Sequence, residues 1–216
     1  GLAVADMLAG HSLVEGILAG VIKRFRTNEG CHIETSLAEA LLDFQFEVLT
    51  TYFNDGNRKP VRSKYNNAHA YLSAPYGIYQ TRDGYVAIAM TPLPKLGELI
   101  DLEFLKNLHD QKIWFTERDE IKKKIGDWTV NQSTQEILNI LEPADIWCSE
   151  VLDWESMLKH EGFKILDMTQ RIKSLDGLDI KTLRCPIRVD GEIFKSDLAA
   201  PKVGQDNEKI IKEMEL

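Results

Sequence analysis

The chain has 216 residues, of which 44% are apolar and 28% are charged, with 34 acidic against 26 basic side chains. It is long enough to bury a hydrophobic core as one large domain or two small ones. Its net charge of −8 disfavours nucleic acids and anionic membranes as partners, because both repel an acidic surface.

The longest apolar stretch, residues 14–22, is interrupted by Glu15 and by glycines. It falls short of the roughly 20 apolar residues of a membrane span, so no transmembrane helix is predicted. Three scattered cysteines do not form a disulfide framework or a zinc site, which favours a reducing compartment, and we expect the cytoplasm. The chain starts at Gly1 with no signal-peptide pattern, and we expect it to be a fragment of a longer chain.

The first predicted element is a helix from about residue 6 to residue 27. Apolar residues within it recur at steps of three and four, which is the spacing of one helix face. Gly10, Gly16 and Gly20 lower its intrinsic stability by up to ~1 kcal/mol each relative to Ala. We therefore expect this helix to be deeply buried and to pack closely against another backbone.

Residues 31–35 alternate like a short strand. Ser36 and Glu39 then have the spacing of a capping box, which predicts a second helix to about residue 53. The segment 58–73 is polar with little periodicity and is predicted to be a linker.

Residues 74–80 and 85–90 predict two strands joined by an Asp-Gly turn. Residues 92–131 have a helical pattern, in which the basic run 122–124 is placed on a solvated face. Ser133 and Glu136 form a second capping box, before another helix. These elements together predict a small α+β module.

The last part of the chain has weaker signals. We predict a helix over residues 151–160, strands over 163–169 and 185–189, and a final helix over 207–214. The sequence has no internal repeats or low-complexity tracts, so it favours two folded parts separated by linkers.

Four segments, in this order, resemble the family III CoA-transferases of the CaiB/BaiF type, which include formyl-CoA transferase, carnitine CoA-transferase and alpha-methylacyl-CoA racemase. Residues 4–20 are similar to the segment in which the family's reactive aspartate opens a glycine-containing helix. Residues 26–37 resemble its pattern Arg-x-Thr-Gly-x-Gly, a strand, Ser and an apolar residue, with Asn28 replacing the first Gly. Residues 75–79 and 83–89 are similar to its small-domain hairpin.

The resemblance implies an α/β fold, a doubly wound Rossmann-like large domain with a small α+β domain, of which this chain is the C-terminal portion. Residues 1–57 would belong to the large domain and carry the catalytic Asp, and residues 58–73 would be a linker. Residues 74–142 would form the small domain, and residues 143–216 a return linker and a C-terminal large-domain segment. The family also implies an interlocked homodimer, whose linkers cross between domains.

By resemblance, Asp6 is the catalytic carboxylate. It would attack the thioester of an acyl-CoA to give a mixed anhydride, and the released CoA thiolate would convert this to an aspartyl-CoA thioester. The positive end of the helix dipole would stabilise the Asp6 anion. Taken without the resemblance, Asp6 is read as a plain helix cap. Leu37 lies where the family has an apolar residue near the CoA or acyl group, and core packing is the alternative.

The segment 66–73 occupies the place of a glycine-rich lid in some family members, but it contains no glycine. Asn67, His69 and Tyr71 can equally be linker residues. His11 is interpreted as a packed or exposed histidine rather than a catalytic one. No metal and no permanently bound cofactor are implied; coenzyme A and acyl-CoA are substrates, with a small carboxylic acid as the other partner.

Two alternatives stay open. Racemases of the family have a Glu shortly after the second hairpin strand, whereas this chain has the sequence Met-Thr-Pro-Leu over residues 90–93 and no acid until Glu98, which favours transfer. A non-catalytic half that assembles with a partner polypeptide is the second alternative. Because the chain is acidic, the basic groups that bind the CoA phosphates would come from the N-terminal half of the family fold, and this chain alone is expected to be inactive.

Overall fold

The structure is a computed structural model that describes residues 1–65 and 69–214. It divides into two compact units, Gly1–Val151 and Leu152–Leu216. Both units contain helices and strands, and every strand pair among the described residues is antiparallel. The described part is therefore a mixed α/β chain.

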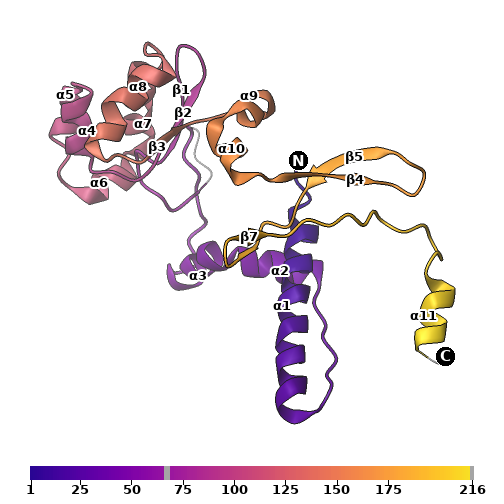
Figure 1. The fold of residues 1–216 in the computed structure, drawn as a ribbon. Coiled ribbons are helices and arrows are strands. Elements are labelled where there is room, and N and C mark those ends of the chain that lie inside the picture. Colours follow the sequence, from indigo (N-terminus) through magenta and orange to yellow (C-terminus); the bar gives the residue numbers. More distant parts are fainter. Residues whose placement is uncertain (66–68, 215–216) are drawn as a thin grey trace. The chain divides into compact units, whose positions relative to one another are not determined.

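Three helices open the first unit (Figure 1): α1 (Val4–Thr27), α2 (Leu37–Phe44) and α3 (Phe46–Asn54). The predicted second helix is thus two helices, with a break at Gln45. The predicted strand at residues 31–35 was wrong, because this segment is extended but pairs with no strand in the part of the chain that is described. α1 ends at Asn28, whose φ of 55° is left-handed, a conformation that Gly and Asn tolerate best.

The glycines of α1 allow the returning chain to pass close to the helix. A Cβ atom on Gly16 would lie 2.7 Å from Ile33 Cγ2, and one on Gly20 would lie 2.9 Å from Cys31 Sγ. Close packing is thus present at these two positions, but the predicted backbone partner is wrong, because the contacting atoms belong to side chains. Gly10 has open space around it.

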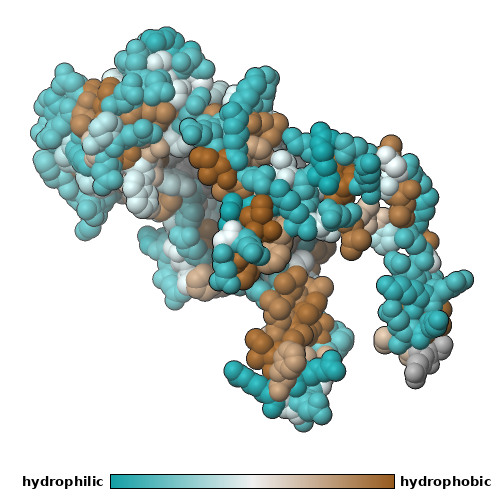
Figure 2. Space-filling model, viewed as in Figure 1, coloured by the Kyte–Doolittle hydropathy of each residue, from teal (hydrophilic) through white to brown (hydrophobic). Residues whose placement is uncertain are grey.

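The predicted deep burial of α1 is wrong for this chain, since no α1 residue is buried. Leu18 is 58% exposed and Phe25 is 86% exposed, and Figure 2 shows apolar side chains gathered over this helix. α1 is also long and apolar enough to cross a membrane by length and composition, contrary to the sequence-based expectation. Core helices of soluble proteins meet the same criterion, and the close contacts of Gly16 and Gly20 are those of a packed helix.

The predicted hairpin is confirmed as β1 (Gly77–Gln80) and β2 (Tyr85–Ile88), to which β3 (Cys148–Glu150) adds a third antiparallel strand. Thr81 N donates to Gly84 O across the turn at 2.9 Å. The Asp83 carboxylate accepts hydrogen bonds from the Thr134 backbone N–H (2.8 Å) and from its hydroxyl (3.0 Å). These bonds, the backbone one first, lower the pKa of Asp83 and fix the turn to the start of α8.

Helices α4 (Leu93–Leu99), α5 (Glu103–Lys106), α6 (Gln111–Thr116), α7 (Arg118–Thr129) and α8 (Thr134–Leu141) follow, then a 3-10 turn, η1 (Glu142–Ala144). The Ser133–Glu136 capping box is present as predicted. At Ser36 only half of a capping box forms. The Glu39 backbone N–H donates to the Ser36 hydroxyl, but the Glu39 carboxylate accepts from that same hydroxyl and not from the Ser36 backbone N–H. The core lies between the sheet and these helices and contains Val86, Ile88, Leu93, Leu96, Leu105, Ile121, Ile125, Ile137 and Leu141.

The run 122–124 is not a uniformly solvated face, and that prediction was wrong for Lys122. This residue is 1% exposed, because it lies one position after Ile121 and three before Ile125, on the side of α7 that faces the rest of the unit. Lys123 stays exposed and pairs with Asp127 at 2.8 Å.

The second unit contains α9 (Trp154–Lys159), α10 (Glu161–Leu166), β4 (Thr169–Lys173), β5 (Asp179–Leu183), β6 (Arg188–Val189), β7 (Glu192–Ile193) and α11 (Asn207–Glu213). The helices predicted at 151–160 and 207–214 are confirmed. The strand predicted at 163–169 was wrong, because the His160 ring accepts from Gly162 N (3.1 Å) and caps α10 there. The strand predicted at 185–189 is reduced to β6.

Candidate functional site

Asp6 lies in the first turn of α1 and is exposed. The helix begins at Val4 with Ala3 at the N-cap, so Asp6 is the third helical residue. Its carboxylate has no hydrogen bond or ion pair within the described ranges 1–65 and 69–214. The interpretation of Asp6 as a plain helix cap is therefore wrong, and its carboxylate is open to a reactant.

The start of α1 has unused hydrogen-bond donors around Asp6. The first bond of the helix is Met7 N to Ala3 O at 3.1 Å. The N–H groups of Val4, Ala5 and Asp6 consequently have no acceptor in the described part of the chain, and Ala3 offers no side-chain cap. Free N–H groups at the positive end of a helix dipole stabilise negative charge that develops beside them.

Leu37 is the first residue of α2 and is 52% exposed. The chain runs back along α1 from Gly20 to Gly16 before it enters α2, and Figure 1 shows α2 beside the N-terminal half of α1. α2 therefore lies along the half of α1 that carries Asp6. The exposure of Leu37 disfavours the core-packing alternative within this chain. The His11 ring bonds to Met7 O at 2.7 Å, so it is held by its own helix.

A cavity of about 500 Å³ lies beside the segment that was considered as a lid. Its walls come from that segment, from the residues just after β2 and from α6, and they comprise Tyr71, Leu72, Ser73, Ala74, Met90, Thr91, Pro92, Gln111, Trp114 and Phe115. No charged side chain is among these residues. The structure therefore brings together the lid segment and the place where racemases of the family have a Glu, and it offers uncharged hydrogen-bonding groups there.

Tyr71 contributes the most informative group of this cavity. Its hydroxyl is buried and has no hydrogen-bond partner among the described residues. Its backbone N–H donates to His69 Nδ1 at 3.2 Å, and Ala74 N donates to Trp114 O at 2.9 Å, so both ends of this short segment are held. A buried hydroxyl without a partner is unfavourable by about 1–3 kcal/mol, and a ligand oxygen would satisfy it. Asn67 lies outside the described residues.

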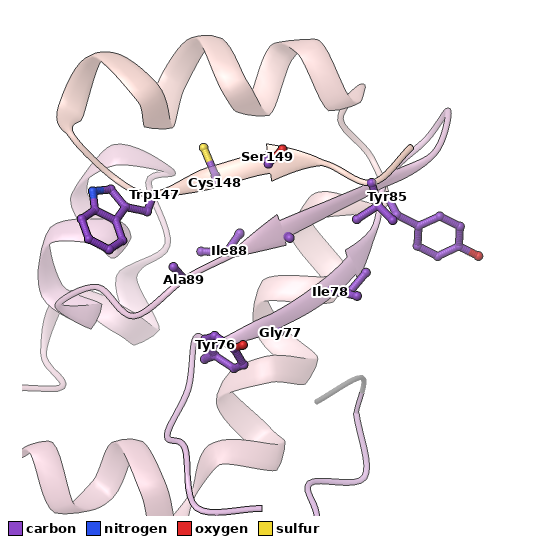
Figure 3. A pocket seen from close by; sticks show the side chains of 11 residues that line it. Tyr76, Gly77, Ile78, Tyr85, Ile88, Ala89, Trp147, Cys148 and Ser149 are labelled. Atoms are coloured by element: carbon purple, nitrogen blue, oxygen red, sulfur yellow. The ribbon is translucent and has the colours of Figure 1, made fainter. Parts of the chain in front are cut away.

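A second cavity, of about 770 Å³, covers the outer face of the three-stranded sheet (Figure 3). Ile78, Tyr85 and Trp147 line it, and Cys148 adds a thiol whose pKa is raised by burial. Trp147 is 77% exposed. This is an open apolar surface, and it contains no pair of residues suited to acid–base or nucleophilic chemistry.

Within the described residues, no group of three His, Cys, Asp or Glu side chains is placed to hold a metal ion. The three cysteines are free. The candidate groups for chemistry described above are the Asp6 carboxylate and the hydrogen-bonding side chains of the cavity around Tyr71.

The sequence profile of CoA-transferase family III matches residues 1–207. The chain belongs to CoA-transferase family III, the CaiB/BaiF family.

Among curated relatives, the chain is similar to a succinate–glutarate CoA-transferase of Agrobacterium fabrum, with 26% identity over 100% of this chain and 54% of that protein. It is 28% identical to a succinyl-CoA:mesaconate CoA-transferase of Haloarcula hispanica over 66% of this chain and 36% of the relative. The chain spans about half the length of the curated relatives that it matches along its whole length.

Solved structures have the same fold. A CaiB/BaiF family protein from Brucella suis matches with a TM-score of 0.72 and 24% identity over 99% of this chain and 56% of the other. A protein of Mycobacterium tuberculosis matches with a TM-score of 0.73 and 18% identity over 96% of this chain and 55% of the other. The fold of this chain is thus about half of the fold of these proteins.

Proposed function

We propose that the complete protein transfers coenzyme A between an acyl-CoA and a carboxylic acid, with Asp6 as the acyl-accepting residue. The observation that carries this proposal is the open Asp6 carboxylate, with free N–H groups beside it, in a chain of CoA-transferase family III. A carboxylate nucleophile retains the activated acyl group, because the anhydride and the thioester that it forms are both reactive.

The reaction proceeds in four acyl-transfer steps. An Asp6 oxygen attacks the thioester carbon, the C–S bond breaks, and CoA leaves as a thiolate from a mixed anhydride. The thiolate attacks the Asp6 carbonyl carbon and releases the first acid. The second acid attacks the aspartyl-CoA thioester and again releases the thiolate, which then attacks the acyl carbon of the new anhydride. The products are the new acyl-CoA and the free Asp6 carboxylate.

The free N–H groups of Val4, Ala5 and Asp6 have a role in these exchanges. Each attack at the thioester or anhydride carbonyl places negative charge on an oxygen next to Asp6. Preorganised backbone donors at this position stabilise that oxyanion more than they stabilise the neutral carbonyl, and removing one such donor from an enzyme costs about 3–4 kcal/mol of the barrier.

The acids are proposed to be small dicarboxylic acids. The names of the relatives above pair a succinyl group with a second acid, glutarate or mesaconate. We propose that the cavity around Tyr71 receives the acid, because its hydroxyls and the Gln111 amide can donate to carboxylate oxygens and its walls contain no carboxylate that would repel them. The buried Tyr71 hydroxyl supplies a donor that has no other partner among the described residues.

A racemase is the second candidate. It requires a proton-transferring residue near the thioester, and the corresponding place, Met90 and Thr91, lies in the wall of this cavity without an acid. This composition favours transfer. A non-catalytic half is the third candidate. The exposed apolar face of α1 would pack against further polypeptide in such a protein. It would do the same in an enzyme, so it does not separate the two candidates.

The remaining features belong to the same proposal. The complete protein is proposed to be a doubly wound α/β enzyme with a small α+β domain and to form an interlocked homodimer in the cytoplasm. This chain alone is proposed to be inactive, because its charge of −8 does not favour the CoA phosphates.

The test is an exchange assay. The complete protein is incubated with succinyl-CoA and glutarate, and glutaryl-CoA is measured by chromatography. We expect Asp6→Asn to lower the rate at least a thousandfold and Glu15→Gln, an exposed acid on the same helix, to leave it unchanged. Equal activity of Asp6→Asn and the unaltered protein would contradict the role of Asp6.

A further inference from the structure

Lys122 is a buried basic residue that the proposed reaction does not use. The residue is 1% exposed, and its ammonium group has no hydrogen bond or ion pair in the part of the chain that the structure describes. The two lysines that follow it each have a partner. Lys123 pairs with Asp127 at 2.8 Å, and Lys124 Nζ lies 5.8 Å from the centre of the Phe104 ring. A buried ammonium without a partner is costly, so its environment has to be explained.

Asp119, three residues before Lys122, is the acid whose charge acts on this lysine, but its carboxylate is hydrogen-bonded elsewhere. Asp119 accepts hydrogen bonds from the Ser63 hydroxyl at 2.7 Å and from the Lys64 backbone N–H at 2.9 Å. These bonds fix the segment around residue 63 to the start of α7. The carboxylate therefore anchors the linker and forms no ion pair with Lys122.

A second cation lies close to Lys122. The Arg118 guanidinium is stacked on the Phe115 ring at 4.2 Å and donates to Val61 O. Arg118 itself is only 8% exposed. Burial, and after it the charge of Arg118, lower the pKa of Lys122 to about 8. The two cations repel each other in a place where little water screens them.

Lys122 also lines a cavity of about 330 Å³ next to α7. The other walls are Tyr65, Ile78, Tyr79, Gln80, Lys123, Gly126, Asp127 and Val130. The acid in this wall, Asp127, is paired with Lys123, and the Tyr79 hydroxyl donates to Pro75 O at 2.5 Å. The cavity thus combines an unused cation with polar side chains, and its volume is large enough for a carboxylate or phosphate group.

We propose that this cavity is a binding site for a small oxyanion, a carboxylate or phosphate group, whose charge pairs with Lys122. The Lys122 side chain has four rotatable methylene groups and can turn its ammonium toward an anion in the cavity that it lines. The anion would supply the acceptor that the buried ammonium lacks, and it would offset the repulsion from Arg118. Asp6 is not among the residues that line this cavity, and the anion would be either a phosphate group or the carboxylate of a small acid.

The test compares two anions on the complete protein. Its midpoint of thermal unfolding is measured against sodium phosphate and against sodium succinate, with sodium chloride at matched ionic strength. We expect one or both anions to give a saturable rise in the unaltered protein and in Lys124→Met, an exposed lysine outside the cavity wall. Lys122→Met should lose the phosphate rise entirely and lose only part of the succinate rise, because the proposed substrate site also binds succinate. A phosphate effect that Lys122→Met loses would identify a phosphate group, and a loss of part of the succinate effect would identify a carboxylate.

Competitive labelling provides a second measurement that needs no variant. Trace acetic anhydride labels lysines, and mass spectrometry gives the extent of labelling at each position. We expect the anion to lower the labelling of Lys122 at least threefold and to leave Lys124, which does not line the cavity, unchanged. Two results would overturn the proposal: no saturable anion effect in the unaltered protein, or an equal effect in Lys122→Met together with unchanged labelling of Lys122.

Discussion

Replacing Lys122 with Met tests the cost of burying this amine without a partner. The pKa of Lys122 is about 8, against an ordinary value of 10.5, and burial is the main cause. At 1.36 kcal/mol per pKa unit, this difference corresponds to about 3 kcal/mol. Met has nearly the same length as the aliphatic part of Lys and no charge, so it fills the same space without that cost.

The sign of the effect follows from proton binding. Below pH 8 the amine is protonated in both the folded and the unfolded chain, and the folded chain bears the whole cost. Between pH 8 and 10.5 the unfolded chain binds more protons, so the free energy of unfolding of the unaltered protein rises with pH. Above pH 10.5 the amine is neutral in both states and the cost is absent.

The assay is urea unfolding of the complete protein, followed by tryptophan fluorescence from pH 7 to pH 10 in a buffer without phosphate or carboxylate. We expect Lys122→Met to be more stable by about 3 kcal/mol at pH 7, with this advantage shrinking toward pH 10. Lys123→Met, which removes an exposed and paired lysine, should show no such trend. A Lys122→Met advantage that is absent, or that stays constant with pH, would show that the buried ammonium does not destabilise the folded protein.

Three further predictions concern the cavity, the linker and α1. Tyr71→Phe removes one hydrogen bond to the acid and should raise the KM for the acid about three- to tenfold, with the yield of acylated Asp6 unchanged. Asp119→Ala releases the linker from α7, so amide hydrogen exchange over residues 61–65 should become at least tenfold faster. Gly16→Ala places a Cβ 2.7 Å from Ile33 Cγ2 and should lower the free energy of unfolding by about 1–3 kcal/mol.

Matched controls separate these effects from general damage. Tyr85→Phe removes a hydroxyl from a half-exposed tyrosine and should leave the KM for the acid unchanged. Gly10→Ala lies on the same helix with open space around it, and it should stabilise the protein by up to about 1 kcal/mol through helix propensity. A Gly10→Ala variant as unstable as Gly16→Ala would contradict the packing argument, and a Tyr71→Phe variant with an unchanged KM for the acid would contradict a Tyr71 bond to the acid.

Local sequence signals predicted the elements whose stabilising interactions are themselves local. The hairpin around the Asp83-Gly84 turn and the Ser133–Glu136 capping box formed as expected, because turn and cap geometry depend on neighbouring residues. Neither the β4–β5 hairpin nor β3 was predicted. For β3 the reason is that it has only three residues and pairs with β2 from more than 50 positions away. The alternation at residues 31–35 indicated a strand, yet this segment packs its side chains against α1.

The candidate site was predictable in part. The resemblance alone pointed to Asp6, and the structure then removed its helix-cap interpretation by starting α1 at Val4. The cavity around Tyr71 was not predictable, because its walls come from three separate segments that only the fold brings together. The burial of Lys122 was missed for a similar reason, since a run of three lysines has no sequence signal for the one that faces inward.

The most direct test of the account is to trap the acylated enzyme. The complete protein is incubated with succinyl-CoA, quenched with hydroxylamine, and digested for mass spectrometry. The account predicts a hydroxamate on Asp6 and on no other acid, and its absence in Asp6→Asn. An unmodified Asp6 with solvent deuterium incorporated next to the thioester would indicate a racemase, and an unmodified Asp6 with no deuterium would indicate a non-catalytic chain; either result would contradict covalent transfer through Asp6.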